Sequence, residues 1–341
     1  MSEKKPYLVD VPVRVNIWIR PECQKRQFEI LKQARPSIIF LQSDGGRNEK
    51  EWEAIRENRK LIDEGIDWEC TVYRLYEEKN NGLYAMGIKT EELVWSKVDR
   101  CIFLEDDHLP SVSFFRFAAE LLEKYKDDTR IHTICSMNYS GIWEETTSDY
   151  FFCERGSIWG KATWKRVYEQ EKLALNYSKD PYTMRVLRDI AKKDKAALDG
   201  FEGYAKNPLY NGHVPGSEFF KRLHTYGQNQ LYIIPKYNMM SNIGCTDDAA
   251  HASEYNLMPR GIRRLFNMKT YEYNFPLKHP EYMIADRKYK TLEEKVLGRN
   301  RPLLCFIRKI EGVLLAFRYY GIKGVTQKLT NFLTRRKRIE K

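Results

Sequence analysis

The sequence has no run of apolar residues long enough to cross a membrane. No window of its 341 residues approaches the roughly 18 apolar residues that a membrane span needs. Residues 1–13 contain lysines but lack the apolar core of a secretory signal peptide. We therefore expect a protein that neither spans the membrane nor is secreted by that route.

The spacing of the cysteines matches no common framework. The seven cysteines are an odd number, are scattered from Cys23 to Cys305 and include no CxxC pair. This pattern argues against a disulfide framework or a zinc site and favours a reducing, cytoplasmic environment. No internal repeat or low-complexity tract stands out either.

The composition is that of a globular protein with an excess of positive charge. Hydrophobic residues make up 42% and charged residues 31%, so the chain can bury a sizeable core as one large α/β domain or two smaller ones. The formal net charge of +11 suggests an anionic partner, such as nucleic acid, acidic lipid or a phosphorylated substrate. A basic surface that is simply solvated is the alternative.

Strand-like and helix-like segments alternate through the first 137 residues. Short apolar runs predict strands at 11–19, 36–42, 68–76, 101–104 and 131–137, with charged helical segments between them. Crossovers of this length predict an α/β fold with a largely parallel sheet flanked by helices. The rhythm then changes, and we expect short strands at 149–153 and 231–235, a helix led into by 157–164, and further helices at 180–198 and from Ser217.

The stretch at 101–108, CIFLEDDH, organises the rest of the chain. A strand buried on both faces runs directly into Glu105, Asp106 and Asp107. Adjacent carboxylates repel one another, and burial of one without a partner is costly, so a positive group is expected there. A divalent cation with a nucleotide diphosphate would meet this need. In the alternative, one acid caps the helix that starts near Pro110 and the others are solvated.

Other polar residues follow the predicted parallel strands. Arg20 follows the first, Asp44 the second and Asn81 the third, and parallel strands all end at one edge of a sheet. We expect these side chains to line one ligand crevice together with the acids at 105–107.

The last segment, 291–341, differs in character. Apolar residues from Leu303 to Phe317 recur at helical spacing among many lysines and arginines, and an Arg-Arg-Lys-Arg run follows at 335–338. This pattern predicts basic amphipathic helices attracted to an anionic membrane surface. A helix docked on the core with a basic tail is the alternative.

Five motifs together resemble one family. They are WIRP at 18–21, QSDGG at 42–46, FLEDD at 103–107, RGSIWG at 155–160 and IPKYNMMSNIG at 234–244. Their order resembles the GT-A nucleotide-sugar glycosyltransferases, in particular bacterial family-2-like enzymes related to animal N-acetylglucosaminyltransferase I. The resemblance spans about residues 11–255 and implies a GT-A catalytic domain at 1–290. Its donor-binding half would be about 11–140 and its acceptor half about 141–290.

The resemblance also implies roles for the residues at the donor site. By position, Asp107 would bind Mn²⁺ or Mg²⁺, Asp106 the ribose and Glu105 the donor sugar. Asp44 would read the base beside Asn81. Arg20 would meet a phosphate.

Three residues further along the chain complete the site that the resemblance implies. His251 would be a second metal ligand or a diphosphate contact, with Asp247 and Asp248 as rivals and an ordinary loop residue as the alternative. Glu218 would be the catalytic base, in a position where the relatives usually have aspartate; Asp199 and Glu202 are its rivals, and a first-turn acid favoured by the helix dipole is the structural alternative. Trp159 would stack on the acceptor sugar, whereas Trp164 is expected in the core.

These expectations describe a metal-dependent inverting glycosyltransferase. It would move a sugar from a nucleotide-sugar, in the first instance a UDP-sugar, to a glycan or lipid-linked acceptor in bacterial surface polysaccharide synthesis, at the inner face of the cell membrane. Nucleic acid is not expected as a partner. Two alternatives are a non-catalytic sugar- or nucleotide-binding relative and a metal-dependent nuclease, which would need further carboxylates converging on the same metals.

Overall fold

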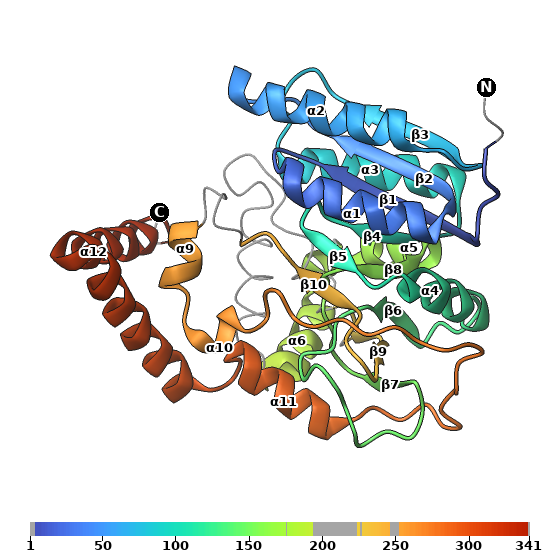
Figure 1. Ribbon diagram of the computed structural model, residues 1–341. Helices are drawn as coiled ribbons and strands as arrows, with labels where there is room; N and C mark the ends of the chain where they lie inside the picture. Colours follow the sequence, from blue (N-terminus) through green and yellow to red (C-terminus); the bar gives the residue numbers. More distant parts are fainter. Residues whose placement is uncertain (1–3, 175, 194–223, 226, 246–251, 340–341) are drawn as a thin grey trace.

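The computed structural model describes residues 4–339 apart from 175, 194–223, 226 and 246–251 (Figure 1). The described strands are β1 (Val9–Ile17), β2 (Pro36–Ser43), β3 (Thr71–Tyr76), β4 (Arg100–Leu104), β5 (His108–Pro110), β6 (Ile131–Cys135), β7 (Tyr150–Cys153), β8 (Lys161–Trp164), β9 (Leu231–Pro235) and β10 (Met240–Asn242). The described helices are α1 (Pro21–Ala34), α2 (Glu49–Gly65), α3 (Leu83–Lys97), α4 (Ser113–Lys124), α5 (Lys165–Ala174), α6 (Pro181–Ile190), α9 (Ala252–Leu257), α10 (Arg260–Arg263), α11 (Arg287–Leu297) and α12 (Pro302–Ile339), with short 3₁₀ turns at η1 (Tyr177–Lys179) and η2 (Ala191–Lys193).

A central eight-stranded sheet with the order β3-β2-β1-β4-β8-β6-β9-β7 carries the fold. The pairs β3/β2, β2/β1, β1/β4 and β6/β9 are parallel, whereas β8 and β7 run antiparallel to their neighbours. Helices flank the sheet (Figure 1). The predicted α/β class with a mostly parallel central sheet is therefore confirmed.

The first strand and its flanking helices form the centre of the core. Val11, Val13, Val15 and Ile17 on β1 are fully buried, as expected for a parallel strand covered on both faces. α1 begins at Pro21, whose fixed φ suits the first helical turn. The fully buried aromatic residues of α4 pack into the same cluster. This packing fixes the position at which β1 ends.

The chain reverses its direction of travel across the sheet between β1 and β4. It passes from β1 outward to β2 and β3, and then returns to add β4 on the other side of β1. Val13 accordingly pairs with Ile39 of β2 on one side and with Ile102 of β4 on the other. Connections leave the carboxyl ends of β1 and β4 in opposite directions, and ligands of α/β proteins bind at such a point.

One short element was not foreseen. Residues 157–164 lead into a helix as expected, since α5 begins at Lys165, but Lys161–Trp164 itself forms β8, antiparallel between β4 and β6. Four residues are too few to display a periodicity, and their strand conformation depends on neighbours that are distant in sequence. Trp164 is in the core as predicted, 3% exposed, and its indole N–H donates to the Leu122 carbonyl at 3.0 Å.

The C-terminal segment is helical, as predicted. α12 consists of two helical parts separated by Gly321, which has a positive φ of 61° that suits glycine. None of the helices in the described part of the chain has both the length and the apolar character needed to cross a bilayer. The boundary near residue 290 stays a prediction, and the helix expected from Ser217 lies outside the described residues.

Candidate functional site

Glu105 is held at the carboxyl end of β4 by two side chains of β1. Arg14 donates from Nη2 to Oε1 of Glu105 at 2.8 Å, and Asn16 donates from Nδ2 to Oε2 at 3.1 Å. Arg14 also donates to the Leu104 carbonyl at 3.0 Å. Because Arg14 and Asn16 are two residues apart on a strand, they project from the same face of β1. The turn after β4 is thereby fixed to its neighbouring strand.

Arg20, three residues after β1 ends, bridges the other two acids. Its Nε and Nη2 donate to the two carboxylate oxygens of Asp106 at 2.8 and 2.7 Å, a bidentate pair. Its Nη1 donates to Oδ2 of Asp107 at 3.0 Å. Asp106 is buried, whereas Arg20 and Asp107 are partly exposed. The expected positive partner of the acids is therefore present within the protein.

The capping alternative does not hold in the structure. The backbone N–H groups of Val112 and Ser113, where α4 begins, donate to the carboxylate of Glu272 at 3.0 and 2.7 Å. Asp106 and Asp107 pair with Arg20 instead. The acid triplet is thus free of any role in starting α4.

Glu105 and Asp106 differ in their affinity for protons. Removal from bulk water opposes ionisation of Glu105, but the Arg14 guanidinium outweighs it and lowers the pKa of Glu105 to about 2. Burial dominates at Asp106 and raises its pKa to about 6, with Asp107 and Glu105 adding to the rise and Arg20 opposing it. Within the described part of the chain, three carboxylates pair with two guanidinium groups, so the cluster keeps an excess of negative charge.

His108 and Gln27 support the turn that carries the acids. The backbone N–H groups of Glu105 and Gly160 donate to Nδ1 of His108 at 3.1 and 3.2 Å, so this nitrogen carries no proton. Burial lowers the pKa of His108, which keeps the ring neutral, and Nε2 lies 3.7 Å from Oδ1 of Asp107. Gln27 of α1 donates to the carbonyls of Glu105 and His108 at 2.6 and 2.7 Å.

The segment after β10 forms a wall of the cluster. The backbone N–H of Ile243 donates to the Asp107 carbonyl at 2.9 Å. A Cβ on Gly244 would lie 2.3 Å from Oδ2 of Asp107 and 2.4 Å from Nη1 of Arg20, so only glycine fits without displacing them. The IPKYNMMSNIG motif at 234–244 therefore ends directly against the acid triplet.

The residues present fit a divalent cation that takes part of its coordination from a ligand. No group of three or more metal-binding side chains occurs among the described residues. Oδ1 of Asp107, however, accepts no hydrogen bond from the described residues, and Asp107 is partly exposed. Mg²⁺ and similar ions typically take one or two carboxylates and complete their shell with phosphate oxygens and water. The cluster suits that mode of binding and does not form an all-protein cage.

Asp44 and Asn81 meet at the end of β2, as their positions in the sequence predict. The Asp44 carboxylate accepts hydrogen bonds from the backbone N–H groups of Gly45, Asn81 and Gly82, and the shortest distance to each nitrogen is 2.9 Å. It also accepts one from Nδ2 of Asn81 at 3.1 Å. Gly82 precedes α3, so Asp44 anchors the start of that helix. The role of Asp44 and Asn81 in reading a base stays a prediction.

We predict that Asp44→Ala lowers the free energy of unfolding by about 2–3 kcal/mol, because three backbone N–H groups in a largely enclosed loop lose their acceptor. Chemical denaturation of wild type and variant measures the change. Asp44→Asn, which keeps one carbonyl oxygen, should lie between the two. An Asp44→Ala protein as stable as wild type would contradict the anchoring role.

The remaining predicted site residues fall in different places. Trp159 is partly buried beside the main core, and its ring centroid lies 5.1 Å from that of Phe266. Glu218 and His251 lie outside the described residues, as do the rivals Asp199, Glu202, Asp247 and Asp248. The roles of Trp159, Glu218 and His251 stay predictions.

Sequence reasoning missed Arg14, Asn16, Gln27 and His108. A signal existed for the first two, since Arg14 and Asn16 alternate with valine and isoleucine in a strand of a sheet expected to be flanked by helices. Polar side chains covered by such helices need partners. Gln27 had no comparable signal because it lies in a helix that is rich in polar residues.

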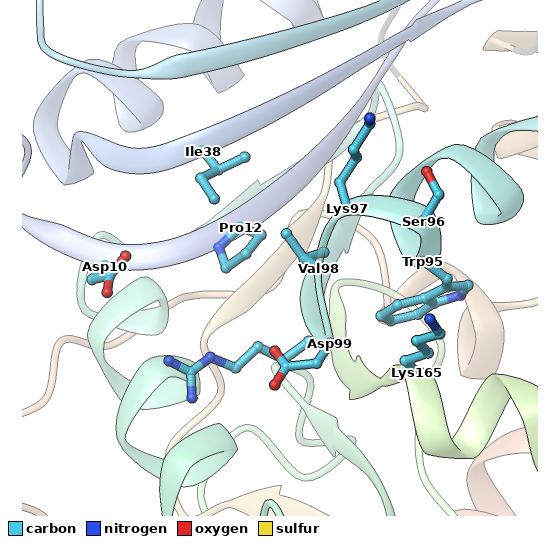
Figure 2. Close-up of a pocket in the computed structure, with 10 residues that line it drawn as sticks. Asp10, Pro12, Ile38, Trp95, Ser96, Lys97, Val98, Asp99 and Lys165 are labelled. Atoms are coloured by element: carbon cyan, nitrogen blue, oxygen red, sulfur yellow. The ribbon is translucent and has the colours of Figure 1, made fainter.

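A cavity of about 490 Å³ lies away from the acid cluster. It is lined by residues at the amino-terminal ends of β1, β2 and β4, among them Asp10, Ile38 and Arg100, and by Trp95 and Lys97 at the end of α3 (Figure 2). The acid triplet follows the opposite, carboxyl end of β4. We take the triplet as the candidate site because it combines the switch point with titratable groups of shifted pKa.

Comparisons with known proteins give only distant structural likenesses. No protein-family model matches the sequence, and no curated protein has a significantly similar sequence. The fold is similar to a mannosyltransferase of Pyrobaculum calidifontis in complex with GDP-Man and Mn²⁺, with a TM-score of 0.32 and 10% identity over 49% of this chain and 48% of that one, so the match spans about half the mannosyltransferase.

Two further solved structures are matched over more of their length. A UDP-glucose pyrophosphorylase complexed with UDP-glucose has a TM-score of 0.34 and 10% identity over 68% of this chain and 93% of that one. Mouse xyloside xylosyltransferase 1 has a TM-score of 0.35 and 11% identity over 80% of this chain and 98% of that one. Likenesses at this level assign no function to the chain.

Proposed function

We propose that the protein is a metal-dependent glycosyltransferase that uses a nucleotide-sugar donor. The observation that carries the proposal is the cluster of Glu105, Asp106 and Asp107 at the switch point between β1 and β4, with one carboxylate more than its two guanidinium partners can neutralise. An excess of negative charge beside an arginine suits a divalent cation that carries a diphosphate. The order of sequence motifs supports the same assignment.

Each member of the cluster has a separate task in this proposal. Asp107 would bind Mn²⁺ or Mg²⁺ through Oδ1, which accepts no hydrogen bond from the described residues. Asp106 would bind the ribose. A cation held at Asp107 would supply positive charge to stabilise the leaving diphosphate. Arg20 would then bind a donor phosphate in place of part of its contact with the acids. Glu105, fixed by Arg14 and Asn16, would orient the donor sugar.

The reaction would invert the anomeric centre of the donor sugar. The acceptor hydroxyl attacks the anomeric carbon as its bond to the diphosphate oxygen breaks, and the hydroxyl proton passes to a carboxylate. We assign that carboxylate to Glu218 on the basis of the sequence. The motif at 155–160 would supply Trp159 to the acceptor side.

The donor is proposed to be a UDP-sugar and the acceptor a glycan or lipid-linked saccharide in bacterial surface polysaccharide synthesis. Support for the donor comes from the resemblance at residues 42–46 and 103–107. Support for the acceptor comes from the aromatic RGSIWG motif and from the basic C-terminal helices. The protein would act in the cytoplasm, peripherally at the inner face of the membrane.

A thermal-shift panel tests the donor class. The full chain is melted with UDP-, GDP-, CDP- and TDP-sugars, each with Mn²⁺ and with EDTA. A donor at a hundred times its Kd should stabilise the fold by about 2.7 kcal/mol, and only with the cation present. Failure of every nucleotide-sugar to stabilise the protein, or equal stabilisation in EDTA, would contradict the proposal.

Measurement of turnover distinguishes an enzyme from a non-catalytic relative. The stabilising donor is incubated with Mn²⁺, and release of nucleoside diphosphate is followed with and without candidate saccharide acceptors. We expect release that depends on Glu218 and is lost in Glu218→Gln while donor binding persists. A Glu218→Gln variant with unchanged turnover would remove Glu218 from the mechanism.

A further inference from the structure

The first part of α12, up to the break at Gly321, exposes a row of large apolar side chains, which we name the apolar stripe. These side chains are between 46% and 71% exposed. The apolar stripe consists of Leu303, Phe306, Ile307, Ile310, Leu314 and Phe317. Spacings of three and four residues place its members on one face of the helix, over about 21 Å of its length.

The opposite face of the same helix attaches α12 to the protein. Arg308 donates to the Val296 carbonyl at the end of α11 at 2.8 Å, and the thiol of Cys305 to the Gly298 carbonyl at 3.0 Å. Ala316 is fully buried. Because Cys305, Arg308 and Ala316 lie on the side of the helix opposite the apolar stripe, the stripe points away from the rest of the molecule.

The sequence of α12 is strongly basic. Residues 302–339 contain a single acid, Glu311, whose carboxylate accepts a hydrogen bond from the backbone N–H of Arg260 in the body of the protein at 3.0 Å. Lys309 and Arg318 lie on the two borders of the stripe by helical spacing. The nine basic residues of this stretch are Arg308, Lys309, Arg318, Lys323, Lys328, Arg335, Arg336, Lys337 and Arg338.

We infer that the apolar stripe docks α12 in the plane of a membrane that contains anionic lipid. A contiguous exposed apolar row with basic borders is the pattern of an interfacial helix, in which the apolar face enters the acyl boundary and the cations meet lipid phosphates. A second copy of the chain fits less well, because pairing two stripes would bring two segments of strong positive charge together.

The docking surface is connected to the candidate site through neighbouring elements. Phe266 pairs with Asn242 of β10, whose partner in β5 is His108, and the Phe266 ring contacts Tyr255 of α9. α9 in turn packs against α12, and β1 and β4 end on the side of the sheet that faces α9 and α12 (Figure 1). Membrane docking does not depend on the proposed transferase activity, so each can fail without the other.

Vesicle co-sedimentation of the full chain tests the inference. We expect binding to phosphatidylcholine vesicles that contain a fifth of phosphatidylglycerol, little binding to pure phosphatidylcholine, and weaker binding in high salt. The Leu314→Ser/Phe317→Ser variant should lower the partition coefficient at least about tenfold, because two exposed apolar side chains no longer enter the bilayer.

Leu173→Ser is the matched control, since Leu173 is 64% exposed on α5. It should leave vesicle binding unchanged, and all variants should melt like wild type because the altered side chains are exposed. Absence of binding to the anionic vesicles, or equal binding by wild type and the double variant, would overturn the inference. A second result would also overturn it: light scattering shows that wild type is a dimer and the double variant a monomer, and wild type does not bind vesicles. The stripe would then bind a second copy of the chain.

Discussion

Asp107→Asn is expected to reduce donor turnover by about 10³-fold, because the variant loses the charge with which the cluster would hold the cation on the leaving diphosphate. The substitution keeps the shape of the side chain, and its amide oxygen can still accept from Arg20, whose Nη1 lies 3.0 Å from Oδ2 of Asp107. The fold should therefore remain. Steady-state rates of nucleoside diphosphate release, with Mn²⁺ varied, measure the loss.

Asp127→Asn is the control for this prediction. Asp127 is an exposed acid between α4 and β6, away from the acid triplet. Its substitution makes the same change in net charge and should leave turnover and the Mn²⁺ dependence unchanged. If Asp107→Asn kept wild-type turnover, or if both variants lost activity equally, the acid triplet would not be the cation site.

Arg20→Ala should destabilise the fold by about 2–4 kcal/mol at neutral pH, because it leaves the Asp106 carboxylate buried without its bidentate partner. Asp106 is 3% exposed, so water cannot replace the guanidinium without a change in the turn. Urea denaturation of wild type and variant measures the difference. Arg20→Lys should recover only part of it, since an ammonium group cannot form the bidentate pair.

The destabilisation by Arg20→Ala should shrink at low pH. The pKa of Asp106 is already raised from 3.8 to about 6, so the folded state holds a proton that the unfolded chain releases between these values. The stability that Asp106 contributes is therefore complete below pH 3.8 and is lost as the pH rises through 6. At pH 5, protonation of Asp106 limits the destabilisation of the Arg20→Ala variant by its unpaired carboxyl to below about 2 kcal/mol, since each pH unit above 3.8 corresponds to 1.36 kcal/mol.

A second substitution separates this effect from lost packing. Arg20→Ala/Asp106→Asn removes the buried charge together with its partner and should recover most of the stability lost in Arg20→Ala at neutral pH. Glu105 should not produce the same trend, because Arg14 lowers its pKa to about 2 and its contribution is lost only as the pH falls toward that value. Equal destabilisation by Arg20→Ala at pH 5 and pH 7.5 would contradict this account of Asp106.

Much of the first half of the fold could be predicted from the sequence, because its apolar runs are long and its crossovers regular. The first four parallel strands follow from the periodicity of the apolar residues, and the placement of Asp44 and Asn81 at one edge follows from the parallel arrangement of those strands. The short strands β5, β8 and β10 could not be predicted in this way. Three or four residues are too few to show a periodicity, and their conformation depends on partners far along the chain.

The acid cluster illustrates the same limit. The sequence predicts that three adjacent acids need a positively charged partner. It cannot identify which basic side chain that partner is, since Arg14 lies 91 residues before Glu105 in the chain. The sequence did not indicate that Arg20 pairs with Asp106 and Asp107, and its role in meeting a phosphate stays a prediction. Both contacts arise because β1 and β4 become neighbours only when the chain has crossed the sheet and returned.

Crystals of the full chain grown with Mn²⁺ and UDP, analysed by anomalous scattering at the manganese edge, test the central claim most directly. We predict a manganese peak in contact with the Asp107 carboxylate and with phosphate oxygens of the nucleotide, and Arg20 moved onto the diphosphate. A nucleotide bound in the cavity lined by Trp95 and Lys97, or Asp106 and Asp107 still joined by Arg20 with no metal beside them, would contradict it.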